Sequence, residues 1–552
     1  MRLLHCALLY IFLFISPAIV AQTDSVTVTG RIRNLTPQLY RRSPQVLITR
    51  TNILQASQEI AHPAPLDAEG RFRVKVPLIY PQEELTFNFN TITTGFLAAP
   101  GTLSIDLNAD SLYVAEVPFR FGGVNAQVNQ QYARYRAYEA QNRKKPDWTR
   151  LTRQAQGRTP AGVHRYLVET FTEPLRAFAA NQRVLPLLSR WLTSVARYDA
   201  ATFQYEQAMA EGTELPAALN DSLRPADDRL LTVARATAME RFSQYAVQTL
   251  NSSVITGSNQ AGRSLPVPTL ASLVERYGKN LTESERQRLR NIGSAGAIKP
   301  QDLRFVNSLV ERSADLFQRL MTYEALIRQS QNRFDTPSVD YLRGYALVSA
   351  LPTLTLTDAQ LFYGHIRPQI KDAYLGPSLS DVYYRETKDS LLIREAAGRL
   401  ATGDSLSGLN EIAPGIFATR NRTTPGSQLF SKLLKNNAGK VVYALIWSPS
   451  VESSQQVALA AQRLRDVFSP RELSLLYIAA PDVDPTLWQE FIVKRNLKGD
   501  HLYLSAEQWS EGISQLGTDY ITVFDRAGKR QRRSAIDPQE FDKLVTQLQK
   551  LL

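Results

Sequence analysis

The chain has 552 residues, with 64 Lys and Arg against 52 Asp and Glu, which gives a formal net charge of +12. Its single cysteine, Cys6, lies in an apolar run at the N-terminus. The rest of the chain has no thiol, so its own residues exclude thiol–disulfide chemistry. The basic residues are scattered apart from a few short clusters, and no recognisable nucleic-acid-binding module accompanies them, so we expect no nucleic-acid partner.

The first residues have the pattern of an export signal. Arg2 supplies one positive charge, and the apolar run over 7–20 is shorter than the roughly 20 residues of a spanning helix. Ala21 is a small residue suited to cleavage by a signal peptidase. We therefore expect 1–21 to be a signal peptide and the mature protein to be periplasmic or secreted. No transmembrane anchor is expected after cleavage.

Residues 24–122 show the short alternating runs of an all-β domain. The runs cover 26–29, 46–48, 72–76, 85–89 and 103–107. Alternation of apolar and polar residues indicates half-buried strands. Turn signals such as 67–70 and 99–101 separate them at spacings typical of a sandwich. We predict an N-terminal antiparallel β-sandwich.

Residues 123–410 are predicted to form a helical middle domain. Arg, Gln, Ala, Leu and Glu recur there at helical spacing, and Thr282 with Glu285 makes a capping-box pattern. Thr357 is expected to open a further helix in the same way, and a loop is expected over 251–268. Two aromatic-rich stretches, 191–205 and 341–363, fit helix cores better than a groove in which peptides or sugars stack.

Residues 425–552 alternate between strands and helices. Strands are expected over 439–447, 473–479, 501–504 and 520–524, and helices over 454–468, 484–496 and 538–552. This alternation predicts βαβ units and a mixed sheet with helices on both faces. The whole chain is therefore a multidomain α+β protein with a C-terminal α/β domain.

Two segments of this last domain resemble a known family. The strand Gly-Lys-Val-Val that ends at Trp447 matches the strand before a Trp-Ala-x-Trp-Cys-x-x-Cys motif. The hairpin over 525–529 matches an Asp-x-x-Gly-Lys hairpin that follows Gly-x-Pro-Thr. The domain thus resembles the thioredoxin-like domain of exported thiol–disulfide oxidoreductases of the TlpA and ResA type, as found in Bacteroidetes-like envelope proteins. Such proteins often carry an N-terminal β-sandwich similar to 24–130.

The sequence departs from that family at the functional positions. Val451 stands where the resemblance places the nucleophilic cysteine, Ser454 where it places the resolving cysteine, and Asp519 where it places the cis-proline. Neither Val nor Ser supplies a thiolate. A cis bond before a non-proline residue costs about 2.5–4 kcal/mol, so we expect a trans bond at Asp519. The resemblance implies a thioredoxin-like domain with a lost active site.

A retained binding rim is the candidate site that this resemblance implies. Its members are Trp447, Val451, Glu452, Ser453, Ser454, Thr518 and Asp519. Glu452, Ser453 and Ser454 come at the expected helix start. There they either form a polar rim for a ligand on free backbone N–H groups or simply cap the helix.

Other chemistry finds little support in the sequence. The histidines at 62, 164, 365 and 501 have no metal-site spacing, so no metal and no cofactor are expected. Asp500 and His501 are adjacent, but a histidine at a strand edge is expected to be partly exposed and not catalytic. The motifs of phosphate loops, nucleophile elbows and zinc-protease helices are missing. Carboxylates of a hydrolase can still converge from distant positions.

The leading hypothesis is an exported, non-redox binding or scaffolding protein of the cell envelope, with an envelope protein or peptide as its partner. A variant of this hypothesis has the chain occupy the substrates or partners of a redox-active relative. The alternative from another class is an envelope hydrolase with its site in the helical domain. A deep pocket with perturbed carboxylates would favour that alternative.

Overall fold

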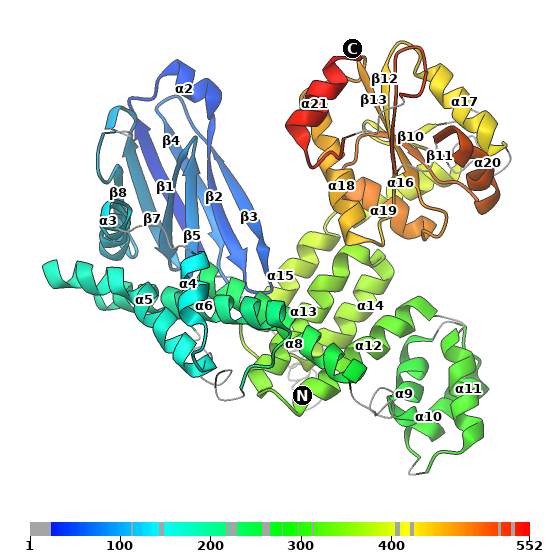
Figure 1. Cartoon of the computed structure of the whole chain (residues 1–552), viewed down its shortest axis with the longest axis horizontal. Coiled ribbons are helices and arrows are strands. Elements are labelled where there is room, and N and C mark those ends of the chain that lie inside the picture. The colour runs from blue at the N-terminus through cyan, green and yellow to red at the C-terminus, as the bar shows by residue number, and fades with distance from the viewer. Residues whose placement is uncertain are drawn as a thin grey trace, which may run out of the picture. The chain divides into compact units, whose positions relative to one another are not determined.

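A computed structural model of the chain describes residues 24–111, 114–142, 148–216, 219, 229–256, 265–278, 280–295, 297–311, 314–402, 409–419, 424–516, 520–531 and 536–552. The expected signal peptide lies outside these residues. The chain divides into two compact units (Figure 1). One comprises Met1–Leu265, Thr322–Tyr345 and Ile370–Leu379, and the other comprises Pro266–Met321, Ala346–Gln369 and Ser380–Leu552. No helix of the described residues is long and apolar enough to cross a membrane.

The first unit contains a sandwich of two sheets. One sheet has the order β4 (Arg71–Pro77), β1 (Ser25–Arg33), β7 (Gly101–Asn108) and β8 (Phe119–Gly123). The other has the order β3 (Gln55–Pro65), β2 (Gln45–Asn52), β5 (Gln82–Phe89) and β6 (Ile92–Ala98), with the short β9 (Leu230–Leu231) beside β5. The inward residues of both sheets share one apolar core that includes Val28, Ile48, Phe87 and Ile105.

The expected strands are present, but within 24–122 the expectation of an antiparallel sandwich is wrong at one pair, and the added β9 also lies parallel to β5. β1 lies parallel to β7, with Val28 opposite Leu103. After β1 the chain forms β2 and β3 in the other sheet and returns as β4, antiparallel to β1. It then forms β5 and β6 in the other sheet and returns as β7, on the other side of β1 and in the same direction. Alternation identifies which residues face inward, but it does not reveal strand direction.

A helix closes one edge of each sheet. α3 (Ala126–Asn142) presents Asn129, whose amide accepts the Leu97 N–H at 2.8 Å and donates to the Leu97 carbonyl at 3.1 Å on β6. The neighbouring Gln130 donates to the Phe119 carbonyl at 3.1 Å and accepts the Phe121 N–H at 3.3 Å on β8. Side-chain amides therefore replace a further strand at β6 and at β8.

The other helices of this unit pack around aromatic residues. They include α4 (Trp148–Ala155), α5 (Pro160–Asn181), α6 (Pro186–Glu211) and α8 (Val233–Thr256), and the short α2 (Pro37–Arg42) precedes β2. Trp191 is fully buried and stacks on Tyr132 with ring centroids 4.1 Å apart. Tyr341 is buried and donates to the Ile53 carbonyl at 2.6 Å. These rings form core, as the sequence indicates. The expectation of a loop over 251–268 is wrong at its start, because α8 continues to Thr256, and 257–264 lie outside the described residues.

The second unit begins with α9 (Val267–Tyr277), α10 (Glu283–Gly293) and α11 (Pro300–Glu311). The capping box of Thr282 and Glu285 is confirmed. α14 (Leu356–Ile366) starts before the predicted Thr357, because the hydroxyl of Thr355 accepts the Asp358 N–H and caps it. Three helices contribute residues to both units, α12 (Ala314–Gln331), α13 (Thr336–Ala350) and α15 (Leu375–Thr387), whereas α16 (Ser390–Thr402) lies in the second unit.

The C-terminal part of this unit is built on a six-stranded mixed sheet. Its order is β10 (Asn410–Ala413), β11 (Ile416–Thr419), β14 (Gly499–Leu502), β13 (Leu473–Ala479), β12 (Val441–Trp447) and β15 (Ile521–Phe524). β11, β14, β13 and β12 are parallel, and β10 and β15 are antiparallel to their neighbours. All residues of β12 and β13 are buried, as expected for central strands.

Helices cover both faces of that sheet. One core cluster joins its inward residues to α16, α18 (Glu452–Gln462), α19 (Pro485–Lys494) and α21 (Phe541–Gln549). A second cluster on the opposite face includes residues of α17 (Gly426–Asn436), with Trp509 of α20 (Ala506–Leu516) packed against it. The predicted mixed sheet with helices on both faces is confirmed. The expected hairpin is present too, because the Asp525 N–H donates to the Lys529 carbonyl at 3.0 Å.

Candidate functional site

The candidate site lies at the connection from β12 to α18. The Ser448 carbonyl accepts the Val451 N–H at 3.4 Å, and the Val451 carbonyl accepts the Gln455 N–H at 3.0 Å, so a tight turn leads into the helix. Val451 is the N-cap residue, with extended backbone angles and no side-chain capping bond. Its side chain is 49% exposed.

The expected side-chain cap of α18 is not formed. The hydroxyl of Ser454 turns back to accept the Ser448 N–H at 2.8 Å, and Val451 has no oxygen with which to cap. The first-turn N–H groups of Glu452 and Ser453 have no partner within the helix, as at every helix start. Glu452 and Ser453 are exposed.

Of the other predicted rim residues, the structure describes Trp447. Trp447 is buried, packs against Phe491 at 5.2 Å between ring centroids, and is core rather than rim. Its Nε1 has no hydrogen-bond partner among the described residues. Thr518 and Asp519 lie outside the described residues, and so does the expected trans peptide at Asp519.

An exposed aromatic residue that sequence reasoning missed lies beside this turn. The Tyr520 carbonyl accepts the Ile446 N–H at 2.8 Å, which places Tyr520 next to the carboxyl end of β12. Tyr520 is 76% exposed. We call Val451, Glu452, Ser453 and Tyr520 the β12 rim. The position of Tyr520 just before β15 was the signal available in the sequence, but the exposure of its side chain depends on tertiary packing.

The β12 rim offers contacts and no thiol. A thiol at a helix start is activated because the positive end of the helix favours its thiolate, and Val451 has no group that ionises. What remains are the exposed side chains of Val451 and Tyr520 near the carboxyl end of β12 and the free backbone N–H donors at the start of α18. This arrangement can bind a group that brings carbonyls or a carboxylate together with an apolar side chain.

Gln455 fixes the turn from behind. Its Nε2 donates to the Pro449 carbonyl at 2.6 Å and to the Pro352 carbonyl at 3.3 Å. Pro352 belongs to the short 3₁₀ segment Leu351–Thr353, in the same unit. The turn is thus held on its inner side by Gln455.

Two perturbed carboxylates lie beside that segment. Burial raises the pKa of Glu490, which accepts the Leu356 N–H at 2.7 Å. Burial also opposes ionisation of Glu386, but the charges of Lys494 at 2.5 Å and Arg495 at 3.5 Å outweigh it and lower its pKa. The space that Glu386 and Glu490 line together has a volume of about 10 Å³, which is room for roughly one water molecule. No substrate fits there, so this pair does not support a hydrolase.

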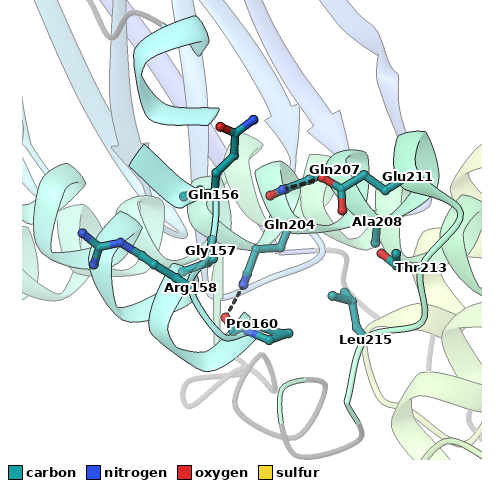
Figure 2. Close-up of a pocket in the computed structure, with 12 residues that line it drawn as sticks. Gln156, Gly157, Arg158, Pro160, Gln204, Gln207, Ala208, Glu211, Thr213 and Leu215 are labelled. Carbon is teal, nitrogen blue, oxygen red and sulfur yellow. Dashed lines mark hydrogen bonds between the residues drawn. The ribbon is translucent and has the colours of Figure 1, made fainter. Parts of the chain in front are cut away.

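A larger pocket lies among α4, α5 and α6 (Figure 2). It has a volume of about 250 Å³, and its lining mixes polar side chains, among them Gln156, Gln204 and Gln207, with small apolar ones. Gln204 donates to the Pro160 carbonyl at 2.8 Å, and Gln207 donates to Glu211 at 2.8 Å. Figure 2 shows the Arg158 guanidinium directed away from the other lining side chains. Glu211 is the single carboxylate among the lining residues, whereas glycoside hydrolysis commonly uses two.

Asp500 and His501 do not form an acid–base pair. They are consecutive on β14, so their side chains leave opposite faces of the sheet. His501 is fully buried rather than partly exposed at an edge, because β14 is an inner strand. Its ring stacks on Tyr477 at 4.8 Å and its Nε2 lies 2.7 Å from the Leu497 carbonyl. Burial lowers its pKa to about 4. Its role is structural.

Comparisons with known proteins identify no family. No protein-family model matches the chain, and no curated protein matches it. Among solved structures, one match is described as "Solution Structure of a putative thiol-disulfide oxidoreductase from Bacteroides vulgatus". It is 18% identical, covers 21% of this chain and 79% of that one, and has a TM-score of 0.18. A likeness this low carries no argument about fold or function. Among the described residues, no group of three or more His, Cys, Asp or Glu is placed to hold a metal ion.

Proposed function

We propose that this chain is an exported, non-redox binding protein of the cell envelope. In this proposal the six-stranded sheet and its helices form a thioredoxin-like domain that has lost its thiols. The β12 rim holds an extended segment of an envelope protein or peptide. The observation that carries the proposal is the exposure of Val451 and Tyr520 beside the unpaired start of α18.

The chemistry of the β12 rim favours a peptide over a small polar metabolite. The backbone N–H groups of Glu452 and Ser453 need acceptors, and peptide carbonyls supply them. Val451 and Tyr520 offer apolar surface for an intervening side chain, and an aromatic ring with a polar tip is common at protein interfaces. The fixed turn behind the β12 rim requires little rearrangement on binding, which reduces the entropy lost.

The test is crosslinked affinity purification from the native envelope fraction with the mature protein and two matched variants. Tyr520→Ala removes an exposed ring at the β12 rim, and Tyr384→Ala removes one that is 70% exposed on α15. We expect one stoichiometric partner whose recovery falls at least about tenfold, or 1.4 kcal/mol, with Tyr520→Ala and is unchanged with Tyr384→Ala.

Equal recovery of the partner by both variants would place binding away from the β12 rim. Reductase activity of the cysteine-free mature chain would overturn the non-redox part of the proposal. These two failures are separate, because one concerns the surface and the other concerns the chemistry.

A further inference from the structure

The outer face of the sheet β4-β1-β7-β8 gathers basic side chains from distant parts of the sequence. Residues alternate between the core and the outside along each strand. The strand register places Lys75 opposite Thr27, Arg73 opposite Thr29 and Arg71 opposite Arg31. On the other side, Asp106 lies opposite Arg31 and Arg120. The cations on this face are Arg31, Arg33, Arg71, Arg73, Lys75 and Arg120, all exposed.

Few of these charges are neutralised. Arg71 pairs with Asp67 at 2.7 Å and with Glu69 at 2.8 Å in the turn before β4. Asp106 is the one carboxylate among the outward residues of the four strands, and it accepts the Arg31 backbone N–H at 2.9 Å. Within the described part of the chain, Arg33, Arg73, Lys75 and Arg120 make no ion pair.

Protection of sheet edges explains only part of this pattern. β4 and β8 are edge strands, and charged side chains there discourage pairing with another sheet. β1 is an inner strand, however, and it carries Arg31 and Arg33 on the same face. Edge protection also does not require one sign of charge. Outward side chains two residues apart lie about 7 Å from each other along a strand, so the cations form an array rather than a line.

The array also carries hydroxyl groups and no rings. Thr27 and Thr29 on β1 lie beside the cations of β4, and Thr102 and Ser104 on β7 lie beside these two threonines. The outward positions of these strands hold no aromatic or large apolar side chain, since the rings of Phe72, Phe119 and Phe121 pack with the core. Single-stranded nucleic acid is generally held by stacking on aromatic side chains, and interfacial membrane insertion needs apolar side chains. This face provides neither.

We propose that the outer face of the sheet β4-β1-β7-β8 binds an anionic polysaccharide. Guanidinium and ammonium groups pair with the repeated carboxylates of the polymer, and Thr and Ser hydroxyls bond its sugar hydroxyls. This site is in the other unit from the β12 rim and does not depend on the function proposed above.

The probe is polygalacturonate, with the same polymer after methyl esterification as its uncharged control. Binding to the mature chain is measured by biolayer interferometry at about 0.1 M and about 1 M salt, where the Debye length falls from ~10 to ~3 Å. We expect binding of the charged polymer alone, lost at high salt. Arg73→Glu with Lys75→Glu weakens it at least about tenfold, or 1.4 kcal/mol. Lys432→Glu with Lys435→Glu on α17 makes the same charge change and leaves it unchanged within about twofold.

Arg33→Gln with Arg120→Gln is the second test, for use if the charge-reversed chain does not show the cooperative melting of the parent. This second variant should also weaken binding of the charged polymer. The proposal is overturned if the esterified polymer binds as tightly, or if the α17 variant loses as much affinity as the β4 variant. Tighter binding of single-stranded DNA or of phosphatidylglycerol vesicles through Arg73 and Lys75 would overturn it as well.

Discussion

The hydroxyl of Ser454 accepts the backbone N–H of Ser448, and this single bond of 2.8 Å spans the turn between β12 and α18. From the sequence alone, the position of Ser454 is interpreted, by resemblance, as that of a resolving thiol. Its side chain has a structural task here, because it satisfies an N–H at the end of a central strand. The turn keeps its shape without a disulfide.

Replacing Ser454 with Ala should lower the free energy of unfolding by about 1–2 kcal/mol, because the half-buried Ser448 N–H loses its acceptor. Urea unfolding followed by tryptophan fluorescence measures the change. Ser453→Ala is the matched control. Ser453 is exposed, and its replacement should stay within about 0.5 kcal/mol of the parent. Equal changes in the free energy of unfolding for the two variants would contradict the structural role assigned to Ser454.

The double variant Val451→Cys with Ser454→Cys should form a disulfide on mild oxidation. The two positions are the N-cap and the third residue of α18, and side chains at those positions face each other, as in a capping box. The helix start should also lower the pKa of the thiol at 451. Thiol titration before and after oxidation tests this. A pair of thiols that stays titratable would show that the turn has lost disulfide geometry.

The stability of the chain should fall in mild acid because of His501. Above a pH of about 6.5 the ring is neutral in the folded and unfolded states. Between a pH of about 6.5 and about 4, His501 binds a proton in the unfolded chain but not in the folded chain. The free energy of unfolding therefore decreases as the pH falls. The complete loss is roughly 3 kcal/mol. His501→Gln should remove this part of the slope in urea unfolding between pH 7 and pH 4, at ~25 °C.

An unchanged slope in His501→Gln would mean that other groups produce the acid sensitivity. Asp500 contributes in the opposite sense. Burial raises its pKa, so its protonation in acid favours the folded state. The histidine effect is therefore best read as the difference between the two proteins.

Asn129→Leu should cost about 2–3 kcal/mol, because the buried Leu97 N–H at the edge of β6 loses its partner. Gln130→Leu is the matched change on the same helix, facing β8. Gln130 is only partly buried and water can replace its bonds, so its loss should cost less than about 1 kcal/mol. Thermal unfolding of both variants checks the order, and the reverse order would contradict the edge-closing role assigned to Asn129.

Strands with strong patterns were predictable from the sequence, and weakly patterned ones were not. β12 is a continuous apolar run and β13 is apolar except for Ser474, because both faces of an inner parallel strand are buried. β3 escaped notice because it lies at an edge, where Pro63 and Pro65 are tolerated and few apolar residues are needed. The parallel pairing of β1 with β7 had no signal, since alternation is the same in both directions.

The candidate site was predictable in position but not in detail. The resemblance located the turn after Trp447, but burial of that ring and exposure of Tyr520 depend on packing against Phe491 and on pairing with Ile446. The basic face was hidden for a similar reason. Its cations lie two apart within strands that are distant in the chain, so the sequence presents them as scattered charges.

The two amides of α3 also bear on how this chain can be shortened. A fragment that stops at the end of β8 contains every strand of the two sheets except β9, yet it lacks Asn129 and Gln130. β6 and β8 would then present unpaired N–H and C=O groups, which are templates for pairing with a second copy. Such a fragment should self-associate in proportion to its concentration, whereas a fragment extended through α3 should resist it.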